Sequence, residues 1–426
     1  MNNLKPSGIE WIGSIPVDWK TVPIYYVAKE VTTKNKTLLR KNAFKFFFGN
    51  IINKPNFNPD EDNYVNKTIR NYIIVNPGDI VINGLNLNFD FVTKRVGMVT
   101  RPGTITSAYI SLRPKANVIL PKYMLYILRT YDSEKAFHNM GGGVRKILNY
   151  DELSKSKIIL PSISAQTRII KFLDKKVSQI DDISKKIQQE ITDLEEYRKS
   201  IITKAVTKGL NPNVPMKDSG IPWIGKIPQN WKIIKGKYLF RLLSKPVKKD
   251  DQVITCFRDG QVTLRVKRRT TGFTMSDQEI GYQGIDKGDL VVHGMDGFAG
   301  AIGISDSRGK GSPVLNVLDS NQDKKYMMYC LRATAQLGVF QALAKGIRVR
   351  SADTRWPTLA NLKYAIPPQS EQANVVNYLS NNSYKLNAII QAKKDLVEKL
   401  NQYKQSIIYE YVTGKKQVPT EEGAVE

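Results

Sequence analysis

An internal repeat is the feature of this sequence that most constrains its fold. Residues 7–20 read SGIEWIGSIPVDWK, and residues 219–232 read SGIPWIGKIPQNWK, with both tryptophans aligned. A repeat with so long a period means that one structural unit is used more than once, so it has to be recognised before any fold is assigned. The second match begins half a chain after the first, and the 426 residues therefore divide into two copies.

Four further pairs of matching segments support this division. They are PGDIVING (77–84) with KGDLVVHG (287–294), YMLYILR (123–129) with YMMYCLR (326–332), LPSISAQ (160–166) with IPPQSEQ (366–372), and LEEYRKSII (194–202) with LNQYKQSII (400–408). All five pairs occur in the same order, which chance cannot produce. The separation changes from pair to pair, so loop lengths differ between the copies.

The first part of each copy has the pattern of a globular domain. It is rich in Gly, Asn, Pro and aromatic residues, and short apolar runs such as YIIV (72–75), DIVIN (79–83) and DLVVH (289–293) are bounded by turn residues. Such runs are typical of buried strands. The segments YMLYILR and YMMYCLR indicate short buried helices. Each globular part is therefore expected to be a mixed α/β or β-rich domain with long loops.

The second part of each copy predicts one long helix. Residues 164–208 and 370–415 contain no proline and hardly a glycine, and apolar residues recur every seven positions. That spacing is the signature of a coiled coil, and some 40 helical residues span roughly 60 Å. The predicted packing residues are Leu173, Ile180, Ile187, Leu194 and Ile201 in the first helix, and Leu379, Leu386, Leu400 and Ile407 in the second, where Lys393 interrupts the stripe and Ile389, Leu396 and Tyr403 run alongside. In the first helix Val177, Ile183 and Ile191 also fill the stripe.

Neither helix can bury such a stripe alone. The other copy supplies a complementary partner, so we expect the two helices to pack on each other, antiparallel if a pseudo-twofold axis relates the copies. The alternative is that each helix packs on its own globular domain. The predicted fold class is α/β (α+β), with globular domains over 1–160 and 211–366. Helical regions cover 161–210 and 367–426, the last ending in a flexible tail.

The sequence offers no catalytic constellation and no metal site. Two histidines, His138 and His293, and two cysteines, Cys256 and Cys330, are too few for histidine-based catalysis, a four-cysteine zinc site or a disulfide framework. No phosphate-binding GxxxxGK[ST] loop occurs, and no Asp/Asn-Pro-Pro-aromatic motif of amino-methyltransferases. The repeated Asp79 and Asp289 follow glycine before an apolar strand, which favours a turn role. Without a signal peptide or membrane-spanning run, a cytoplasmic protein is expected.

The charge indicates a polyanionic partner. Lys and Arg number 65 against 39 Asp and Glu, a formal net charge of +26, which points first to nucleic acid. Basic residues supply affinity for phosphates, and Arg, Asn and Gln can read base edges. A Gly-x-Arg turn recurs at 143–145 and 346–348, and polar His293 stands where the first copy has Asn83. The candidate DNA-contact residues are Lys34, Lys36, Arg40, Lys94, Arg95, Arg145, Lys248, Arg265, Lys267, Arg268, Arg269, His293, Arg348 and Arg350.

These motifs resemble the specificity subunits of type I restriction-modification enzymes. The SGIxWIGxIPxxW segment is similar to that family's start of a target-recognition domain. The Leu/Ile-Pro-x-x-x-x-Gln segments at 160–166 and 366–372 resemble its entry into the conserved helical regions, and Tyr-x-x-Ser-Ile-Ile at 197–202 and 403–408 fits their ends. The resemblance covers essentially the whole chain.

The resemblance implies a DNA-binding subunit that is not itself an enzyme. Each globular domain would recognise one half of a split, asymmetric double-stranded DNA target, and the paired helices would set the spacing between the halves. Two modification subunits, which hold S-adenosylmethionine and methylate adenine, would dock on the helices. Two restriction subunits using ATP and Mg²⁺ would join them, so this chain would hold no cofactor or metal. The family has no fixed base-contact motif, so the residues named above rest on their chemistry alone.

Two other functions are compatible with parts of the pattern. One is an enzyme that acts alone, a DNA methyltransferase or a nuclease. The other is a coiled-coil adaptor without DNA contact. Incubation of the purified protein with DNA, Mg²⁺ and S-adenosylmethionine distinguishes the first, and the salt dependence of DNA affinity distinguishes the second.

Overall fold

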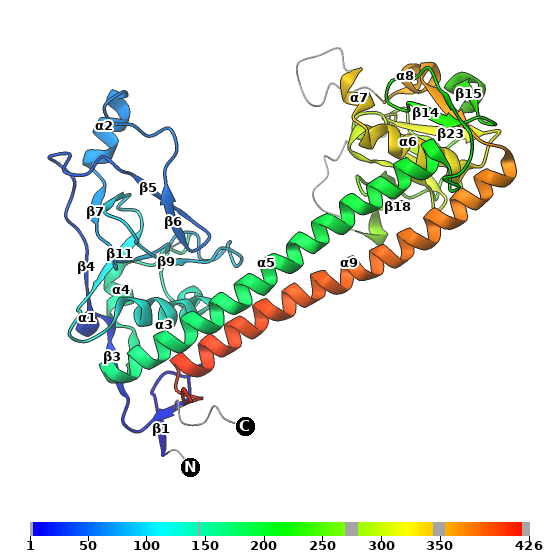
Figure 1. Ribbon diagram of the computed structural model, residues 1–426. Helices are drawn as coiled ribbons and strands as arrows, with labels where there is room; N and C mark the ends of the chain where they lie inside the picture. Colours follow the sequence, from blue (N-terminus) through cyan, green and yellow to red (C-terminus); the bar gives the residue numbers. More distant parts are fainter. Residues whose placement is uncertain (1–2, 144, 269–279, 344–353, 420–426) are drawn as a thin grey trace. The chain divides into compact units, whose positions relative to one another are not determined.

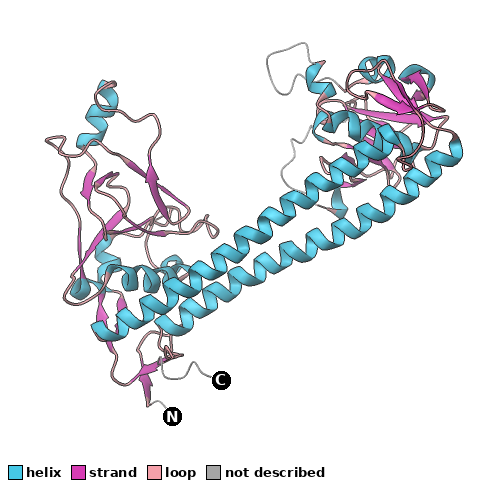
Figure 2. Cartoon of the chain, in the orientation of Figure 1, coloured by secondary structure: helices cyan, strands magenta, loops and turns pink. Residues whose placement is uncertain are grey.

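The computed structural model describes residues 3–143, 145–268, 280–343 and 354–419 (Figures 1 and 2). The chain forms two compact units, Met1–Ile187 with Asp395–Glu426, and Gln188–Lys394. The predicted domain boundaries lie close to the start of the long helices, since strand β12 ends at Leu160 and strand β24 at Ile366. The compact units divide within those helices instead, so each unit contains a segment of both.

The first unit is built around a four-stranded antiparallel sheet in the order β4-β11-β8-β9. Two-stranded pairs β1-β2, β10-β7, β12-β3 and β5-β6 surround it. The strands are β1 Leu4–Pro6, β2 Ser14–Pro16, β3 Lys20–Pro23, β4 Ala28–Glu30, β5 Phe44–Phe47, β6 Asn50–Asn53, β7 Ile73–Val75, β8 Ile80–Ile82, β9 Val96–Met98, β10 Gly103–Ile105, β11 Ile110–Pro114 and β12 Lys157–Leu160. The helices are α1 Ile24–Val27, α2 Asn63–Arg70, α3 Pro121–Ser133, η1 Ala136–Asn139 and α4 Tyr150–Lys155.

The second unit repeats this topology. Its four-stranded sheet has the order β16-β23-β20-β21, and its two-stranded pairs are β13-β14, β19-β22, β15-β24 and β17-β18. The strands are β13 Met216–Asp218, β14 Lys226–Pro228, β15 Lys232–Lys235, β16 Phe240–Leu243, β17 Ile254–Cys256, β18 Val262–Leu264, β19 Gln283–Ile285, β20 Leu290–His293, β21 Ile302–Ile304, β22 Gly309–Gly311, β23 Leu315–Ser320 and β24 Lys363–Ile366. The helices are η2 Gly236–Tyr238, η3 Arg265–Lys267, η4 Gly297–Ala299, α6 Lys324–Gln336, α7 Val339–Ala342 and α8 Trp356–Asn361. The expected pair of similar α/β domains is confirmed.

The repeated YMLYILR and YMMYCLR segments form the buried centres of α3 and α6. Tyr123 and Tyr326 are completely buried, and each hydroxyl donates to a backbone carbonyl at the equivalent place in the strand before the long helix, that of Ile159 at 3.4 Å and that of Ala365 at 3.1 Å respectively. A buried tyrosine needs such a partner because an unpaired hydroxyl in the core is costly. The same residue therefore fixes the same contact in both copies.

The repeated glutamine after Leu/Ile-Pro joins the start of each long helix to the preceding domain. Gln166 is completely buried, accepts from the backbone amide of Leu120 at 2.8 Å and donates to the carbonyls of Val118 and Pro161. Gln372 likewise accepts from the amide of Asp323 at 3.1 Å. These bonds satisfy backbone groups at the N-termini of α3 and α6, which a helix leaves unpaired.

The two long helices are α5, Ile163–Lys208, and α9, Gln369–Val412, of 46 and 44 residues. In the first unit Phe172 of α5 contacts Tyr411 of α9, with ring centroids 4.4 Å apart, and Asp181 pairs with Lys404. In the second unit Arg198 donates to Asn387 at 2.7 Å. In each unit, higher residue numbers on α5 meet lower ones on α9, so the expected antiparallel pairing is confirmed (Figure 1).

The packing stripe of α5 follows the predicted seven-residue spacing. Leu173, Ile180, Ile187 and Ile201 are buried, Leu194 is half-buried, and Val177 and Ile191 lie between them. Ile183 is the exception: it is 48% exposed and faces outward. Spacing that alternates between four and three residues keeps a helix on one seam, and Ile183 falls one position short of it.

The packing stripe of α9 corrects part of the prediction. Leu379, Leu386 and Ile407 are buried and Leu400 is half-buried, as expected, but Ile389 and Leu396 are 45% and 46% exposed. The seam residues are instead Ile390, which is 6% exposed, and half-buried Val397, each one position further along. The residue that follows Leu386 on the same face is Ile390, four positions along, rather than Ile389, three positions along, because a helix makes one turn every 3.6 residues.

Lys393 keeps its place in the seam instead of interrupting the register. Its side chain is 29% exposed and its ammonium pairs with Glu190 of α5. A lysine can bury its methylene stem along an apolar surface while its charged end reaches a partner. The predicted break in the stripe is therefore a cross-helix ion pair.

The opening SGIxWIG motif of each copy packs on the end of the long helix from the other copy. In the first unit the Tyr409 hydroxyl donates to the carbonyl of Trp11 at 3.1 Å. In the second unit Lys208 donates to the carbonyl of Ile224 at 2.9 Å. The motif recurs because each unit needs this contact between its opening segment and the end of a long helix. Among the described helices, none has the length and apolar content required to cross a membrane.

Candidate nucleic-acid interface

The loop between β4 and β5 places several predicted contact residues at the surface of the first unit. Asn35 is completely buried and closes the loop by exchanging hydrogen bonds with the backbone of Arg40 at 2.7 and 3.0 Å. Lys34 and Lys36 flank it and are exposed, and Arg40 is half-buried. Arg145, in the Gly-x-Arg turn, is also exposed. These four residues can reach a ligand.

Arg95 cannot reach a ligand, so the prediction that it contacts DNA is wrong. Its side chain is completely buried and binds the backbone carbonyls of Asn83, Leu85 and Asp90 at 3.0, 2.8 and 2.6 Å. A guanidinium carries five donors in a fixed fork, so one arginine can hold a whole loop. Arg95 therefore shapes the loop between β8 and β9, and its charge is not available to a phosphate.

In the basic cluster of the second unit, Lys267 and Arg268 are exposed and Arg265 is half-buried, and all three already have partners within the chain. Lys267 donates to Ser307 at 2.8 Å, and Arg265 donates to Thr255 at 3.3 Å. Arg268 pairs with Asp259 at 2.8 Å, and its guanidinium lies 4.1 Å from the ring centroid of Phe257. Such contacts hold the long side chains in place at the surface, where a phosphate can still approach them.

Two other predicted sets have different outcomes. Lys248 is exposed in the loop after β16, whereas Arg269, Arg348 and Arg350 lie outside the described residues, as does the second Gly-x-Arg turn. Two nearby cations form ion pairs within the chain. Lys245 pairs with Asp286 and Asp289, and Arg308 pairs with Asp251 and Asp286. Hydrogen bonds from Lys245 and Arg308 lower the pKa of Asp286 to about 2.

His293 has a structural contact that its counterpart in the first copy shares. Its Nδ1 accepts from the backbone amides of Met295 and Asp296 at 3.2 and 3.0 Å. In the first unit the Oδ1 of Asn83 accepts from the amide of Leu85 at 3.2 Å. Burial lowers the pKa of His293, which keeps Nδ1 unprotonated for these bonds. The imidazole shapes the turn, and no structural observation connects it with DNA.

The repeated Gly-Asp pair is a turn device, as expected. Asp79 accepts from the backbone amide of Asn76 at 2.8 Å, and Asp289 from that of Asp286 at 2.8 Å. Both carboxylates are buried and have a cationic partner, Arg113 and Lys245 respectively. In the described part of the chain no group of three or more His, Cys, Asp or Glu could hold a metal ion. Burial raises the pKa of both Cys256 and Cys330 to about 12, which makes these thiols unreactive.

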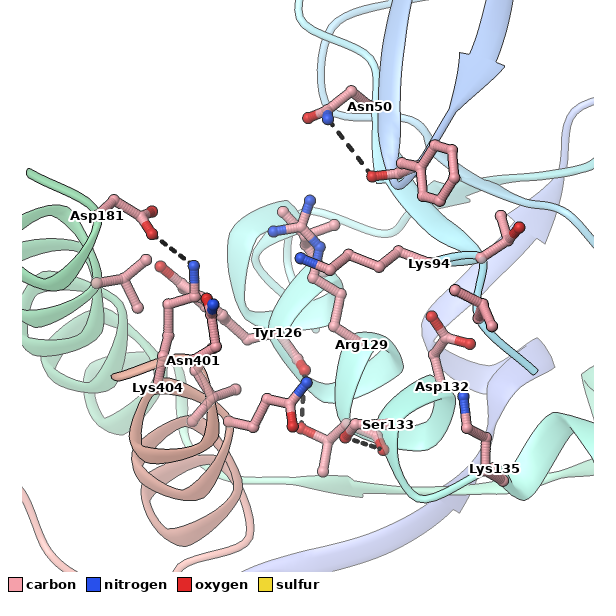
Figure 3. Close-up of a pocket in the computed structure, with 18 of the residues that line it drawn as sticks. Asn50, Lys94, Tyr126, Arg129, Asp132, Ser133, Lys135, Asp181, Asn401 and Lys404 are labelled. Carbon is pink, nitrogen blue, oxygen red and sulfur yellow. Dashed lines mark hydrogen bonds and ion pairs between the residues drawn. The ribbon is translucent and has the colours of Figure 1, made fainter. Parts of the chain in front are cut away.

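A cleft in the first unit was not foreseen from the sequence. It encloses about 670 Å³ between the β5–β6 turn, the loop before β9, α3, and the α5 and α9 helices (Figure 3). Its walls combine aromatic, cationic and amide side chains, among them Phe48, Asn50, Phe91, Lys94, Tyr126, Arg129 and Lys404. These residues come from separate stretches of sequence, so no local motif marks the cleft, although Lys94 was among the predicted contact residues.

Comparison with known proteins tests the resemblance that the repeated motifs indicate. Residues 16–193 match the model of the type I restriction modification DNA specificity domain. The chain is 23% identical over 419 residues to the type I restriction enzyme MjaVIII specificity subunit of Methanocaldococcus jannaschii, covering 94% of this chain and 93% of that one. The resemblance to type I restriction-modification specificity subunits, expected from the repeated motifs, is confirmed.

Two further similarities extend this comparison. A putative type I restriction enzyme MjaX specificity subunit from the same organism is 24% identical over 332 residues, covering 72% of this chain and 71% of that one. A solved structure from work on complex assembly and conformational transition of the type I restriction-modification system superposes with a TM-score of 0.66, at 12% identity, over 94% of this chain and 99% of that chain. That fold is therefore shared over nearly the whole length of this chain.

Proposed function

We propose that this specificity subunit reads a bipartite, asymmetric DNA target, with one globular domain for each half-site. The observation that carries the proposal is a common framework with different surfaces. The loop between β8 and β9 spans 83–95 and contains Lys94 and Arg95, whereas the matching loop between β20 and β21 spans only 294–301 and has Gly300 and Ala301 there. Different side chains on equivalent loops would read different bases.

The hairpin turns beside these loops differ in the same way. The β5–β6 turn presents Phe47 and Phe48, which are 53% and 50% exposed. The equivalent β17–β18 turn carries Arg258, whose guanidinium pairs with Asp296 at 2.9 Å. An aromatic pair and a charged residue make different contacts with a DNA groove, which supports two half-sites of unlike sequence.

The long helices would set the distance between the half-sites. At a rise of about 1.5 Å per residue, the 46 residues of α5 measure roughly 70 Å. Two reading units on one face of a duplex need a separation of about one helical turn, ~34 Å, or a multiple of it. A helix continuous from one unit to the other is suited to fixing such a distance.

The outward faces of the helices support docking of partner subunits. Ile183 and Tyr197 of α5 are 48% and 54% exposed, and their counterparts in α9, Ile389 and Tyr403, are 45% and 56% exposed. Large apolar residues at repeated outward positions fit the surface of another protein better than water. The partners in this proposal are two modification subunits, which bind S-adenosylmethionine and methylate adenine, and two restriction subunits, which use ATP and Mg²⁺.

A seven-residue deletion tests the helices as a spacer. Removing residues 188–194 from α5 together with 391–397 from α9 takes out facing segments that do not line the cleft and preserves the seven-residue register of the seam. The pair should shorten by about 10 Å. With its modification subunits, this variant should lose or change methylation of the native target while still binding each half-site. Unchanged activity and spacing would refute the spacer role.

The non-catalytic role has its own test. The purified subunit, incubated with DNA, Mg²⁺ and S-adenosylmethionine, should neither methylate nor cleave. Addition of the modification subunits should restore methylation of adenine. Methylation or cleavage by the subunit alone would favour the stand-alone methyltransferase or nuclease instead.

A further inference from the structure

In the described part of the chain, the cleft of the first unit holds a lysine without a direct ion-pair partner. Lys94 lies in the loop before β9 and contributes to the cleft wall (Figure 3). Within the described ranges its ammonium makes no hydrogen bond or ion pair. The other three lysines that line the cleft are already bound, Lys135 to the carbonyl of Phe91 at 2.7 Å, Lys122 to Asp174 and Lys404 to Asp181. Lys94 is thus the lysine of the lining whose ammonium remains available to a ligand.

Two further cations, Arg129 of α3 and Lys404 of α9, line the same cleft. In Figure 3 the guanidinium of Arg129 lies beside the end of Lys94, and the ammonium of Lys404 is joined to Asp181. Burial lowers the pKa of Lys94, and the charges of Lys404 and then of Arg129 lower it further, more than Asp181 and Asp132 raise it. Like charges held together in a partly buried cleft are unfavourable unless an anion joins them.

The second unit has an equivalent arginine next to a cation of a long helix. Arg332 of α6 donates to the carbonyls of Ile302 and Gly260, as Arg129 does to those of Val96 and Gly49. Arg198 of α5 stands at the position of Lys404 in the repeat, and its charge also acts on Arg332. The third cation is specific to the first unit, because Gly300 replaces Lys94 in the second.

Hydrogen bonds hold the framework of the cleft. Arg129 donates from Nε to the carbonyl of Val96 at 3.3 Å and from Nη2 to that of Gly49 at 3.2 Å. Lys404 pairs with Asp181 across the two helices. Arg129 and Lys404 are therefore fixed in place before any ligand arrives, and the ligand can gain a direct contact from Lys94 without reorganising them.

The aromatic side chains of the cleft indicate which kind of anion fits it. Phe48 and Phe91 are 50% and 55% exposed beside the cations, and Phe48 adopts a φ of +45° at the tip of the β5–β6 turn. A bulky residue in this left-handed region is strained, and such strain is concentrated where a side chain has a binding role. Exposed rings next to cations fit nucleotides, since bases stack on aromatic faces while phosphates bind the charges.

We propose that this cleft is a phosphate-binding site, with Lys94 as the direct ligand and Arg129 and Lys404 supplying the supporting positive field. The phosphate would come either from the DNA backbone or from a free nucleotide or phosphate ion. The DNA source rests on the function proposed above, whereas phosphate binding itself does not. The second unit lacks Lys94, so the site would be confined to the first.

The experiment uses the full-length subunit and the variants Lys94→Gln, Lys94→Arg and Lys199→Gln. Lys199 pairs with Glu196 on the exposed face of α5, so its substitution changes the net charge equally outside the cleft. Binding of inorganic phosphate and of adenosine 5′-monophosphate is measured by titration calorimetry and thermal shift. Lys94→Gln should weaken phosphate binding about tenfold, Lys94→Arg should retain it, and Lys199→Gln should not change it. Without phosphate, Lys94→Gln should be at least as stable as the wild type.

DNA binding over a range of salt concentrations separates the two sources. If the phosphate belongs to DNA, Lys94→Gln should reduce the slope of log affinity against log salt by about 1, relative to Lys199→Gln. If Lys94→Gln weakens binding of the small probes but leaves the DNA slope unchanged, the site serves a free phosphate or nucleotide. Equal phosphate binding by wild type and Lys94→Gln, or none by either, would overturn the site. A wild-type subunit that binds phosphate in this way but no DNA would contradict the proposed function alone.

Discussion

Adjacent isoleucines on α9 provide a stringent stability test of the helix pair. Ile390 is 6% exposed in the seam, whereas Ile389 is 45% exposed on the outer face, so Ile→Ala at each site removes the same atoms from different surroundings. Truncating a buried isoleucine costs about 2–4 kcal/mol through lost transfer energy and the cavity left behind. At the outer site the loss should stay within about 1 kcal/mol, because alanine's higher helix propensity offsets part of it.

Differential scanning calorimetry of the full-length subunit measures the difference. Both residues belong to the unit Gln188–Lys394, where about 2–4 °C of melting temperature corresponds to 1 kcal/mol. Ile390→Ala should lower the transition of that unit by at least about 4 °C, and Ile389→Ala by clearly less. In the assembled complex, Ile389→Ala should weaken the affinity for partner subunits more than Ile390→Ala does, since Ile389 faces outward. Equal losses of stability, or a larger loss for Ile389→Ala, would refute the seam described here.

Three further predictions concern polar groups. His293→Asn should preserve the turn, as Asn83 does in the first unit. In the wild type, the lowered pKa of His293 means that its contribution to stability is present above about pH 6.5 and declines as the pH falls below it, so this decline should be smaller in His293→Asn melting curves. Asp286, with its pKa lowered to about 2, should contribute stability above about pH 4 that is lost as the pH falls toward 2, and Asp286→Asn should remove this part of the acid dependence seen by circular dichroism. Gln166→Leu should destabilise the first unit by about 2–3 kcal/mol in urea unfolding, because it leaves the buried amide of Leu120 unpaired, and an unchanged midpoint would count against that contact.

The sequence alone predicted the duplicated architecture because each repeated motif performs a repeated structural task. The glutamine at 166 and 372, and the tyrosine at 123 and 326, make equivalent backbone contacts in both units. Such contacts tolerate few substitutions, so the residues that make them still match between the two copies. The long helices were predictable for a related reason, since a seam between two helices requires regular spacing.

The finer details depended on three-dimensional contacts. Periodicity placed Ile389 in the seam because seven-residue spacing fixes only one of the two positions that face a partner helix. Charge alone made Arg95 a DNA ligand, although it is buried by the carbonyls of its own loop. The cleft around Lys94 is assembled from the β5–β6 turn, α3 and both long helices, and only folding brings these segments together.

Mapping methylated adenines across a host genome, with and without this gene, tests the central claim most directly. The account predicts that the gene-dependent sites share a motif of two short defined blocks of different sequence, separated by an unspecified spacer of constant length. Replacing the first globular domain, residues 1–160, with that of another specificity subunit should change one block and leave the other intact. A single continuous motif, a change in both blocks, or the absence of gene-dependent methylation in the presence of active modification subunits would contradict it.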